Sequence, residues 1–165
     1  MEKIESFKVN HLALKRGIYV SRRDVTPSGD VITTFDIRMV EPNRAPHIPG
    51  PAIHAMEHLA ATYLRNDREW GSRIVYWGPM GCLTGNYLIV QGRVEPRDIL
   101  QLVRRTMAHV AMATGPIPGA TAHDCGNYTF MDREGARLAA RQYLDEVLAN
   151  PTEENFTYPA DEVTE

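Results

Sequence analysis

The chain has 165 residues, 43% of them hydrophobic and 24% charged, which is enough for one domain with a substantial core. Its formal net charge is −3, and no run of lysine and arginine residues could follow a phosphate backbone, so we expect no nucleic-acid partner. No stretch is apolar and long enough to span a bilayer, and the N-terminus is charged throughout. Two cysteines are too few for a disulfide framework. We therefore expect one cytoplasmic domain, residues 1–165, with no membrane partner.

Two strands are predicted near the start of the chain. Residues 18–25 and 31–40 flank the turn-forming residues 27–30, a pattern typical of an antiparallel hairpin. In the second strand the apolar side chains alternate with Asp36 and Arg38, which therefore take the opposite face.

A proline-rich loop is predicted next, followed by a helix. Residues 41–51 contain four prolines, which exclude a helix interior or a central strand. The following helix carries the sequence HAMEH at 54–58. Apolar residues recur along it at spacings of three and four, which predicts a stripe facing the core: Ile53, Met56, Leu59, Ala60, Tyr63 and Leu64.

Two further strands and two helices are predicted in the second half of the chain. Strands are predicted at 73–77 and 86–94, joined by a glycine-rich turn that contains Cys82. A helix follows at 97–113, and a last helix begins near Asp132, a plausible N-cap, and runs to the Asn-Pro pair at 150–151. Hairpins interspersed with helices favour an α+β fold, an antiparallel sheet with helices packed on one side.

The HAMEH motif indicates a metal site. His54 and His58 are four residues apart, so on a helix their side chains share one face at about 5 to 6 Å. A lone histidine is more often structural, but this spacing with an intervening Glu57 is a narrower pattern. A third ligand must come from elsewhere, and the candidates are Cys125, Cys82, His123 and Glu134. Cys125 with two histidines suits zinc, iron(II) or cobalt(II) and leaves one coordination position open.

Several short motifs occur in a characteristic order. They are ESF at 5–7 and a following His11, DIR at 36–38, HxxEH at 54–58, PMGC at 79–82 with TG at 84–85, and CGNY at 125–128. Each motif is weak alone, but the ordered set, over roughly residues 5–145, resembles the S-ribosylhomocysteine lyase (LuxS) family. The resemblance implies a homodimeric α+β enzyme with one divalent ion per chain, most often Fe²⁺ and replaceable by Zn²⁺ or Co²⁺. The implied ligands are His54, His58 and Cys125.

The resemblance also implies a reaction and roles for particular residues. The family cleaves the thioether of S-ribosylhomocysteine, giving homocysteine and 4,5-dihydroxy-2,3-pentanedione, the precursor of autoinducer-2. Positions matching Cys82 and Glu57 are its two acid/base catalysts. Positions matching Ser6, His11 and Arg38 help to hold the ribosyl part of the substrate, partly across the dimer interface. We expect His47, His109 and His123 to be structural or exposed.

Two other functions fit the same residues. A metallopeptidase would use Glu57 to activate water and Glu134 as the third ligand. A non-catalytic domain would close a structural zinc site with His54, His58, Cys82 and Cys125. The chain also departs from the family's usual residues at four positions, Asn10, Leu12, Tyr76 and Leu83. Tyr76 takes the place of an aspartate suited to the homocysteine amino group, so recognition of that end of the substrate stays open.

Overall fold

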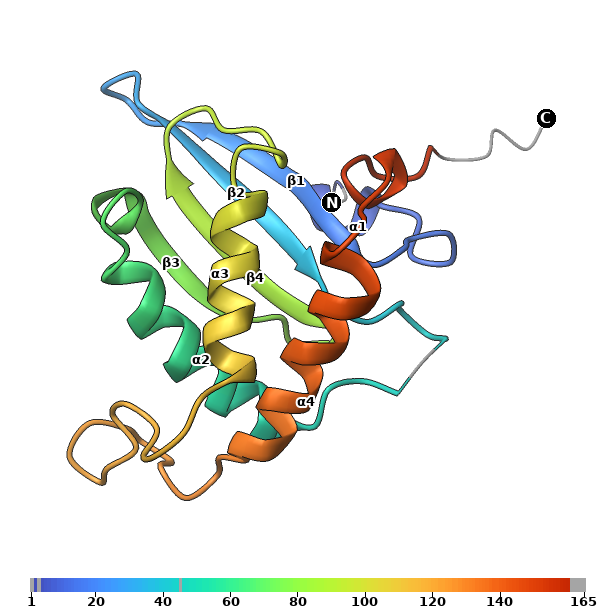
Figure 1. The fold of residues 1–165 in the computed structure, drawn as a ribbon. Helices are drawn as coiled ribbons and strands as arrows, with labels where there is room; N and C mark the ends of the chain where they lie inside the picture. Colours follow the sequence, from blue (N-terminus) through green and yellow to red (C-terminus); the bar gives the residue numbers. More distant parts are fainter. Residues whose placement is uncertain (1, 3, 45, 161–165) are drawn as a thin grey trace.

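A four-stranded antiparallel sheet in the order β1-β2-β4-β3 organises the protein, as drawn in Figure 1. The computed structural model describes residues 2, 4–44 and 46–160. Its strands are β1 (Gly17–Val25), β2 (Val31–Arg38), β3 (Ile74–Pro79) and β4 (Gly85–Gln91). Its α-helices are α1 (Glu5–Lys8), α2 (Gly50–Arg65), α3 (Leu100–Ala111) and α4 (Arg133–Tyr143). Shorter helical turns are η1 (Gly71–Arg73), η2 (Leu144–Leu148) and η3 (Glu153–Asn155).

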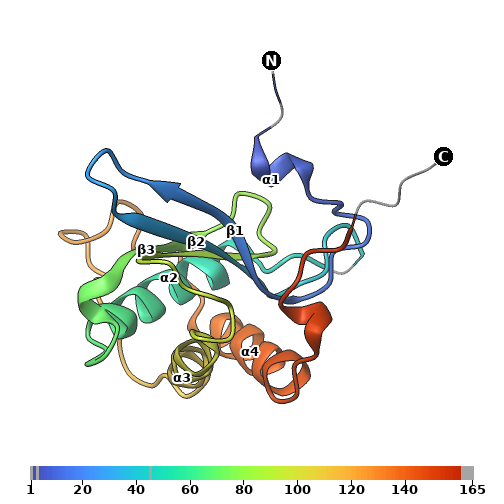
Figure 2. The same ribbon diagram turned by 90° about the horizontal axis from the view of Figure 1, so that it is seen from above.

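The three long helices lie on one face of the sheet, and the short α1 lies on the other (Figure 2). This arrangement confirms the predicted α+β fold. None of the helices within the described part of the chain is long and apolar enough to cross a membrane.

Helix α2 is the central element of the core. Its predicted apolar stripe is buried, except for Tyr63, which is half-buried. His54, Glu57 and His58 lie on the neighbouring strip and remain half-buried. The hydrophobic effect therefore fixes the rotation of α2 and presents its polar residues at the margin of the core.

The element boundaries differ from the predictions by a few residues. Helix α2 begins at Gly50, inside the predicted loop, because Pro51 occupies the first turn, where proline is tolerated. Helix α3 begins at Leu100 rather than at 97 because residues 95–98 form a turn closed by Asp98. Asp132 is the N-cap of α4, as predicted, and its carboxylate accepts a hydrogen bond from the Gly135 amide.

Asp36 and Arg38 form a buried ion pair on the face of the sheet away from the long helices. They are only 2% and 3% exposed, and Arg38 Nη2 lies 2.6 Å from Asp36 Oδ2. The hydroxyl of Tyr158 donates a second hydrogen bond, at 2.9 Å, to the same carboxylate oxygen. The alternation of apolar and charged residues in β2 correctly predicted that Asp36 and Arg38 lie on the face opposite the core. It could not predict that segments distant in sequence bury them there.

Removal of one member of this pair tests its contribution to stability. Arg38→Met leaves the Asp36 carboxylate buried without its cation, so we expect a loss of about 3 to 5 kcal/mol in the free energy of unfolding, measured with urea. The matched control is Arg22→Met, which breaks an exposed ion pair with Asp24 and should cost less than about 1 kcal/mol. Equal losses from both variants would contradict the assigned importance of burial.

Candidate metal and thiol centres

Three residues predicted as metal ligands come together at one end of α2. One ligand atom from each of His54, His58 and Cys125 lies within 4.8 Å of the other two. Cys125 Sγ is 3.5 Å from His54 Nε2. Cys125 comes from the loop between α3 and α4, which packs beside the first turns of α2.

Backbone carbonyls fix the orientation of both imidazoles. His54 Nδ1 lies 2.7 Å from the carbonyl oxygen of Phe130, and His58 Nδ1 lies 2.8 Å from that of Pro118. Because a carbonyl can only accept, each Nδ1 carries the proton and each Nε2 keeps its lone pair for a ligand bond. The loop also approaches closely at Gly119, where φ is +67° and an added Cβ would lie 3.3 Å from His58 Nδ1.

The donor set fits a divalent ion of intermediate softness. The Asn127 amide donates to Cys125 Sγ at 3.5 Å, which orients the sulfur. Two imidazoles and one thiolate suit zinc, iron(II) or cobalt(II), and three protein ligands leave a position for water or substrate.

The other candidate ligands are engaged elsewhere. Glu134 pairs with Arg133 and Arg137 on α4. His123 is exposed and pairs with Asp124. Cys82 contacts Thr84 and Arg38. The geometry therefore does not support the peptidase ligand set or the closed His₂Cys₂ zinc site.

Cys82 lies in the tight turn between β3 and β4. Two backbone hydrogen bonds close this turn. The Met80 amide donates to the Gly85 carbonyl and the Leu83 amide donates to the Met80 carbonyl, both at 2.9 Å. Leu83 has φ of +59°, a conformation that non-glycine residues rarely adopt and that often occurs at functional sites. Its carbonyl accepts the amide of Ile48, which ties the turn to the segment preceding α2.

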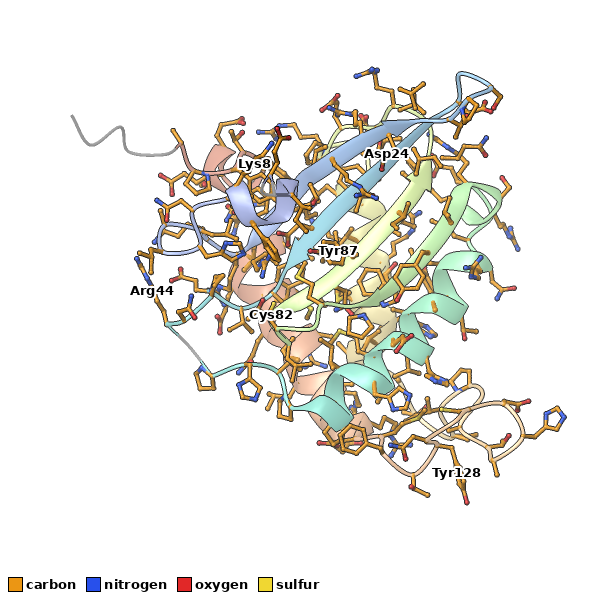
Figure 3. All side chains as sticks on the ribbon, turned by 180° about the vertical axis from the view of Figure 1, so that it is seen from behind. Lys8, Asp24, Arg44, Cys82, Tyr87 and Tyr128 are labelled. Carbon is orange, nitrogen blue, oxygen red and sulfur yellow. The ribbon has the colours of Figure 1, made fainter. Side chains whose placement is uncertain are left out.

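A cavity of about 240 Å³ opens beside Cys82 on the face of the sheet away from the long helices, the face turned toward the viewer in Figure 3. Its polar lining includes two of the predicted substrate-binding residues, His11 and Arg38. Ser21, at the β-bulge in β1, also lines the cavity. The remaining lining residues are Phe7, Val9, Asp36, Met80, Gly81, Tyr87 and Tyr158.

The thiol of Cys82 is more acidic than an ordinary cysteine. Burial alone raises the pKa of this thiol, but hydrogen bonds from Thr84 and the positive charge of Arg38 outweigh burial and lower the pKa overall. Cys82 Sγ lies 3.1 Å from Thr84 Oγ1 and 3.7 Å from Arg38 Nη1. Such a thiol is suited to accepting and returning protons.

For the remaining predicted residues the structure shows the burial or a single contact. Glu57 is half-buried on α2 beside the two histidines. His11 is half-buried, and its Nδ1 lies 2.8 Å from the Val9 carbonyl. Ser6 belongs to α1, but its side chain lies outside the described part of the structure. His47 and His109 are exposed, as expected.

Comparison with known proteins identifies the family of this chain. The sequence profile of the family described as S-ribosylhomocysteinase (LuxS) matches residues 4–154. The chain belongs to this S-ribosylhomocysteinase family. A protein named S-ribosylhomocysteine lyase from Phocaeicola vulgatus is 51% identical over 98% of this chain and 100% of its own. Lyases of the same name from Porphyromonas gingivalis and Clostridium beijerinckii are 52% and 49% identical over 96% of this chain and 99% of theirs.

The match to the S-ribosylhomocysteinase family covers almost the whole chain, but it does not assign roles to individual residues. Asp36, Thr84 and Tyr158 contribute to the thiol side of the site, and the sequence reasoning did not select them. The alternation in β2 put Asp36 beside Arg38, and Thr84 follows Cys82 by two residues, so both had a local signal. Tyr158 had none, because its contact with Asp36 spans 122 positions.

Loss of a ligand should remove the metal. We expect wild-type protein to bind about one Zn²⁺ or Co²⁺ per chain after dialysis, and His54→Ala to retain almost none. His123→Ala is the matched control, because this exposed histidine is in the same loop as Cys125 but lies outside the cluster. Metal content is measured by elemental analysis, and retention by His54→Ala would contradict the assigned site.

Proposed function

We propose that this protein is an S-ribosylhomocysteine lyase, in which the whole chain forms one metal-dependent lyase domain. The reaction converts S-ribosylhomocysteine into homocysteine and 4,5-dihydroxy-2,3-pentanedione, the autoinducer-2 precursor. The observation that carries this proposal is the presence, in a member of this family, of both an open His54/His58/Cys125 cluster and an acidified Cys82 thiol.

Cys82 is proposed to move protons during two isomerisations. A divalent ion held by His54, His58 and Cys125 would supply Lewis acidity that acidifies the C–H groups beside the substrate carbonyl. The Cys82 thiolate then removes the proton at C2 and returns it at C1, which moves the carbonyl from C1 to C2. A second transfer moves the carbonyl to C3.

Glu57 is proposed to complete the reaction. Once the carbonyl is at C3, the proton at C4 is acidic and the sulfur at C5 is a β leaving group. Glu57 removes the C4 proton, the electron pair forms the C4–C5 double bond, and the C5–S bond breaks. The homocysteine thiolate then takes up a proton and the C4 enol tautomerises to a ketone, so the step needs no oxidant or reductant. Glu57 neighbours His58 on α2, which supports this placement.

Substrate recognition is proposed for Ser6, His11 and Arg38. His11 and Arg38 line the cavity beside Cys82, where their donors can reach sugar hydroxyls. Arg38 has a second function, since it also contacts the Cys82 sulfur.

Iron(II) is the proposed physiological metal, with Zn²⁺ or Co²⁺ as functional substitutes. A thiolate and two imidazoles accept all three ions, so availability in the cell decides among them. A cytoplasmic location is proposed because Cys82 and Cys125 are both free thiols, which a reducing compartment preserves.

Thiol release from S-ribosylhomocysteine tests the activity. The protein is loaded anaerobically with Co²⁺, and homocysteine is followed with a thiol reagent. We expect wild-type turnover, and a decrease in kcat of at least about 100-fold in Cys82→Ser and in Glu57→Ala, because each removes an acid/base catalyst. Both variants should retain their metal.

The controls distinguish this function from the alternatives. His109→Ala, an exposed substitution on α3, should leave thiol release unchanged. Metal loss in Cys82→Ser would instead indicate a structural zinc site. No thiol release from folded, metallated wild-type protein would contradict the lyase proposal.

We also propose that the protein is a homodimer, whose interface is the face of the sheet that the long helices leave uncovered. Ile4, Phe7 and Tyr76 are exposed on this face, and half-buried Tyr87 and Ile89 line a further cavity of about 270 Å³ there. The cavity beside Cys82 opens on the same face. A second copy packed here would bury the apolar side chains and enclose the active site, consistent with the family resemblance.

Sedimentation velocity tests the dimer. Wild-type protein should sediment with twice the mass of one chain, whereas Ile89→Glu should shift it toward one chain and reduce thiol release, because a carboxylate cannot be buried unpaired in the interface. Leu138→Glu, which changes an exposed leucine on α4, should remain dimeric. A monomeric wild-type protein with full activity would contradict the proposal.

A further inference from the structure

Tyr158 reaches the thiol centre from the far end of the chain. Its ring is stacked on that of Tyr19, with centroids 4.7 Å apart and planes 13° from parallel. Its hydroxyl donates to Asp36 Oδ2, and its side chain lines the cavity that contains Cys82. Tyr158 lies beyond residues 4–154, which the family profile matches.

The segment before Tyr158 is fixed against the start of β1. Asn155 Nδ2 donates to the Arg16 carbonyl at 2.8 Å, and the Tyr19 hydroxyl donates to the Glu154 carbonyl at 3.0 Å. Gly17 permits this approach, because a Cβ at that position would lie 2.3 Å from the Asn155 carbonyl oxygen. The close contact requires glycine at the first residue of β1.

Arg97 holds the same segment from the other side. Its guanidinium lies 4.5 Å from the centre of the Phe156 ring and forms an ion pair with Glu153. Phe156 is itself buried at the edge of the core. Contacts on both sides therefore place Tyr158 at a defined position, which an unanchored terminal residue would not have.

A continuous series of polar contacts joins Tyr158 to the Cys82 sulfur. Asp36 Oδ2 accepts from the Tyr158 hydroxyl at 2.9 Å and from Arg38 Nη2 at 2.6 Å. Asp36 Oδ1 accepts from Arg38 Nε at 3.1 Å, which makes the ion pair bidentate. Arg38 Nη1 then donates to Thr84 Oγ1 at 2.5 Å and points toward Cys82 Sγ.

We propose that Tyr158 is a positioning residue, which acts through Asp36 and Arg38 to keep Cys82 in its thiolate form. This inference rests on the proposed function of Cys82 as an acid/base catalyst. The Tyr158 hydroxyl donates a hydrogen bond to the Asp36 carboxylate and so reduces the negative charge that Arg38 meets there. The positive charge of Arg38 then acts more strongly on the Cys82 sulfur. The hydroxyl also restricts the rotation of the Asp36 carboxylate, which fixes the direction of the guanidinium.

The surroundings of the cavity support this effect. The titratable or charged groups that line it beside Cys82 are His11, Asp36, Arg38, Tyr87 and Tyr158. Burial, followed by the negative charge of Asp36, raises the pKa of Tyr158 far above its ordinary value. Tyr158 therefore remains a protonated donor throughout the range in which Cys82 titrates.

The pH dependence of Cys82 alkylation tests the proposal in the intact metallated protein. Iodoacetamide modification is followed on the Cys82 peptide by mass spectrometry, which separates it from Cys125. In Tyr158→Phe, which keeps the ring stack and removes only the hydroxyl, we expect the midpoint to rise by about 0.5 to 1 pH unit. At pH values below both midpoints the modification rate should therefore fall about three- to tenfold.

Tyr63→Phe is the matched control, since Tyr63 is stacked on His109 on the helical side of the protein. Its alkylation midpoint should equal that of wild-type protein. Thiol release by Tyr158→Phe should show a lower kcat at pH 7 and recover toward the wild-type value as the pH rises, with the same melting temperature. A purely structural role for Tyr158 predicts no such recovery.

The two proposals can fail separately. An unchanged alkylation midpoint in Tyr158→Phe would overturn the positioning role, whatever the lyase activity. A raised midpoint in a protein whose wild-type form releases no thiol would support the positioning of Cys82 and contradict the lyase function.

Discussion

The buried ion pair between Asp36 and Arg38 is the interaction on which the thiol side of the site depends. Two opposite charges removed from water stabilise a fold only when their hydrogen bonds are well satisfied. Here the carboxylate accepts three hydrogen bonds from Arg38 and Tyr158, and the third guanidinium nitrogen, Nη1, points to Thr84 and Cys82. The arrangement that satisfies the buried charges thus also helps Thr84 to lower the pKa of the Cys82 thiol.

The metal side depends on a different constraint, the rotation of α2. Burial of the apolar stripe that includes Met56 and Ala60 turns His54 and His58 to the margin of the core. Backbone carbonyls of the loop that supplies Cys125 then fix the ring orientations. In the proposed reaction, the centre on the helix would hold the electrophilic metal ion and the centre on the sheet would supply a basic group for proton transfer.

Local patterns were sufficient to predict much of this structure. The spacing of three and four in α2 predicted its buried stripe and the pairing of the histidines, and alternation in β2 placed Asp36 and Arg38 opposite Phe35 and Ile37. These are properties of residues close in sequence. The position of Tyr158 and the closure of α1 over the sheet could not be predicted, because they depend on contacts between distant segments with no periodic signal.

Proton exchange at C2 of the substrate tests most directly whether Cys82 catalyses the isomerisation and Glu57 the β-elimination. S-ribosylhomocysteine is incubated in D₂O with Co²⁺-loaded Glu57→Ala, and the C2 proton is followed by NMR. We expect exchange at C2 without release of homocysteine, because Cys82 remains functional, and no exchange in Cys82→Ser. Exchange at the wild-type rate in Cys82→Ser would contradict this expectation.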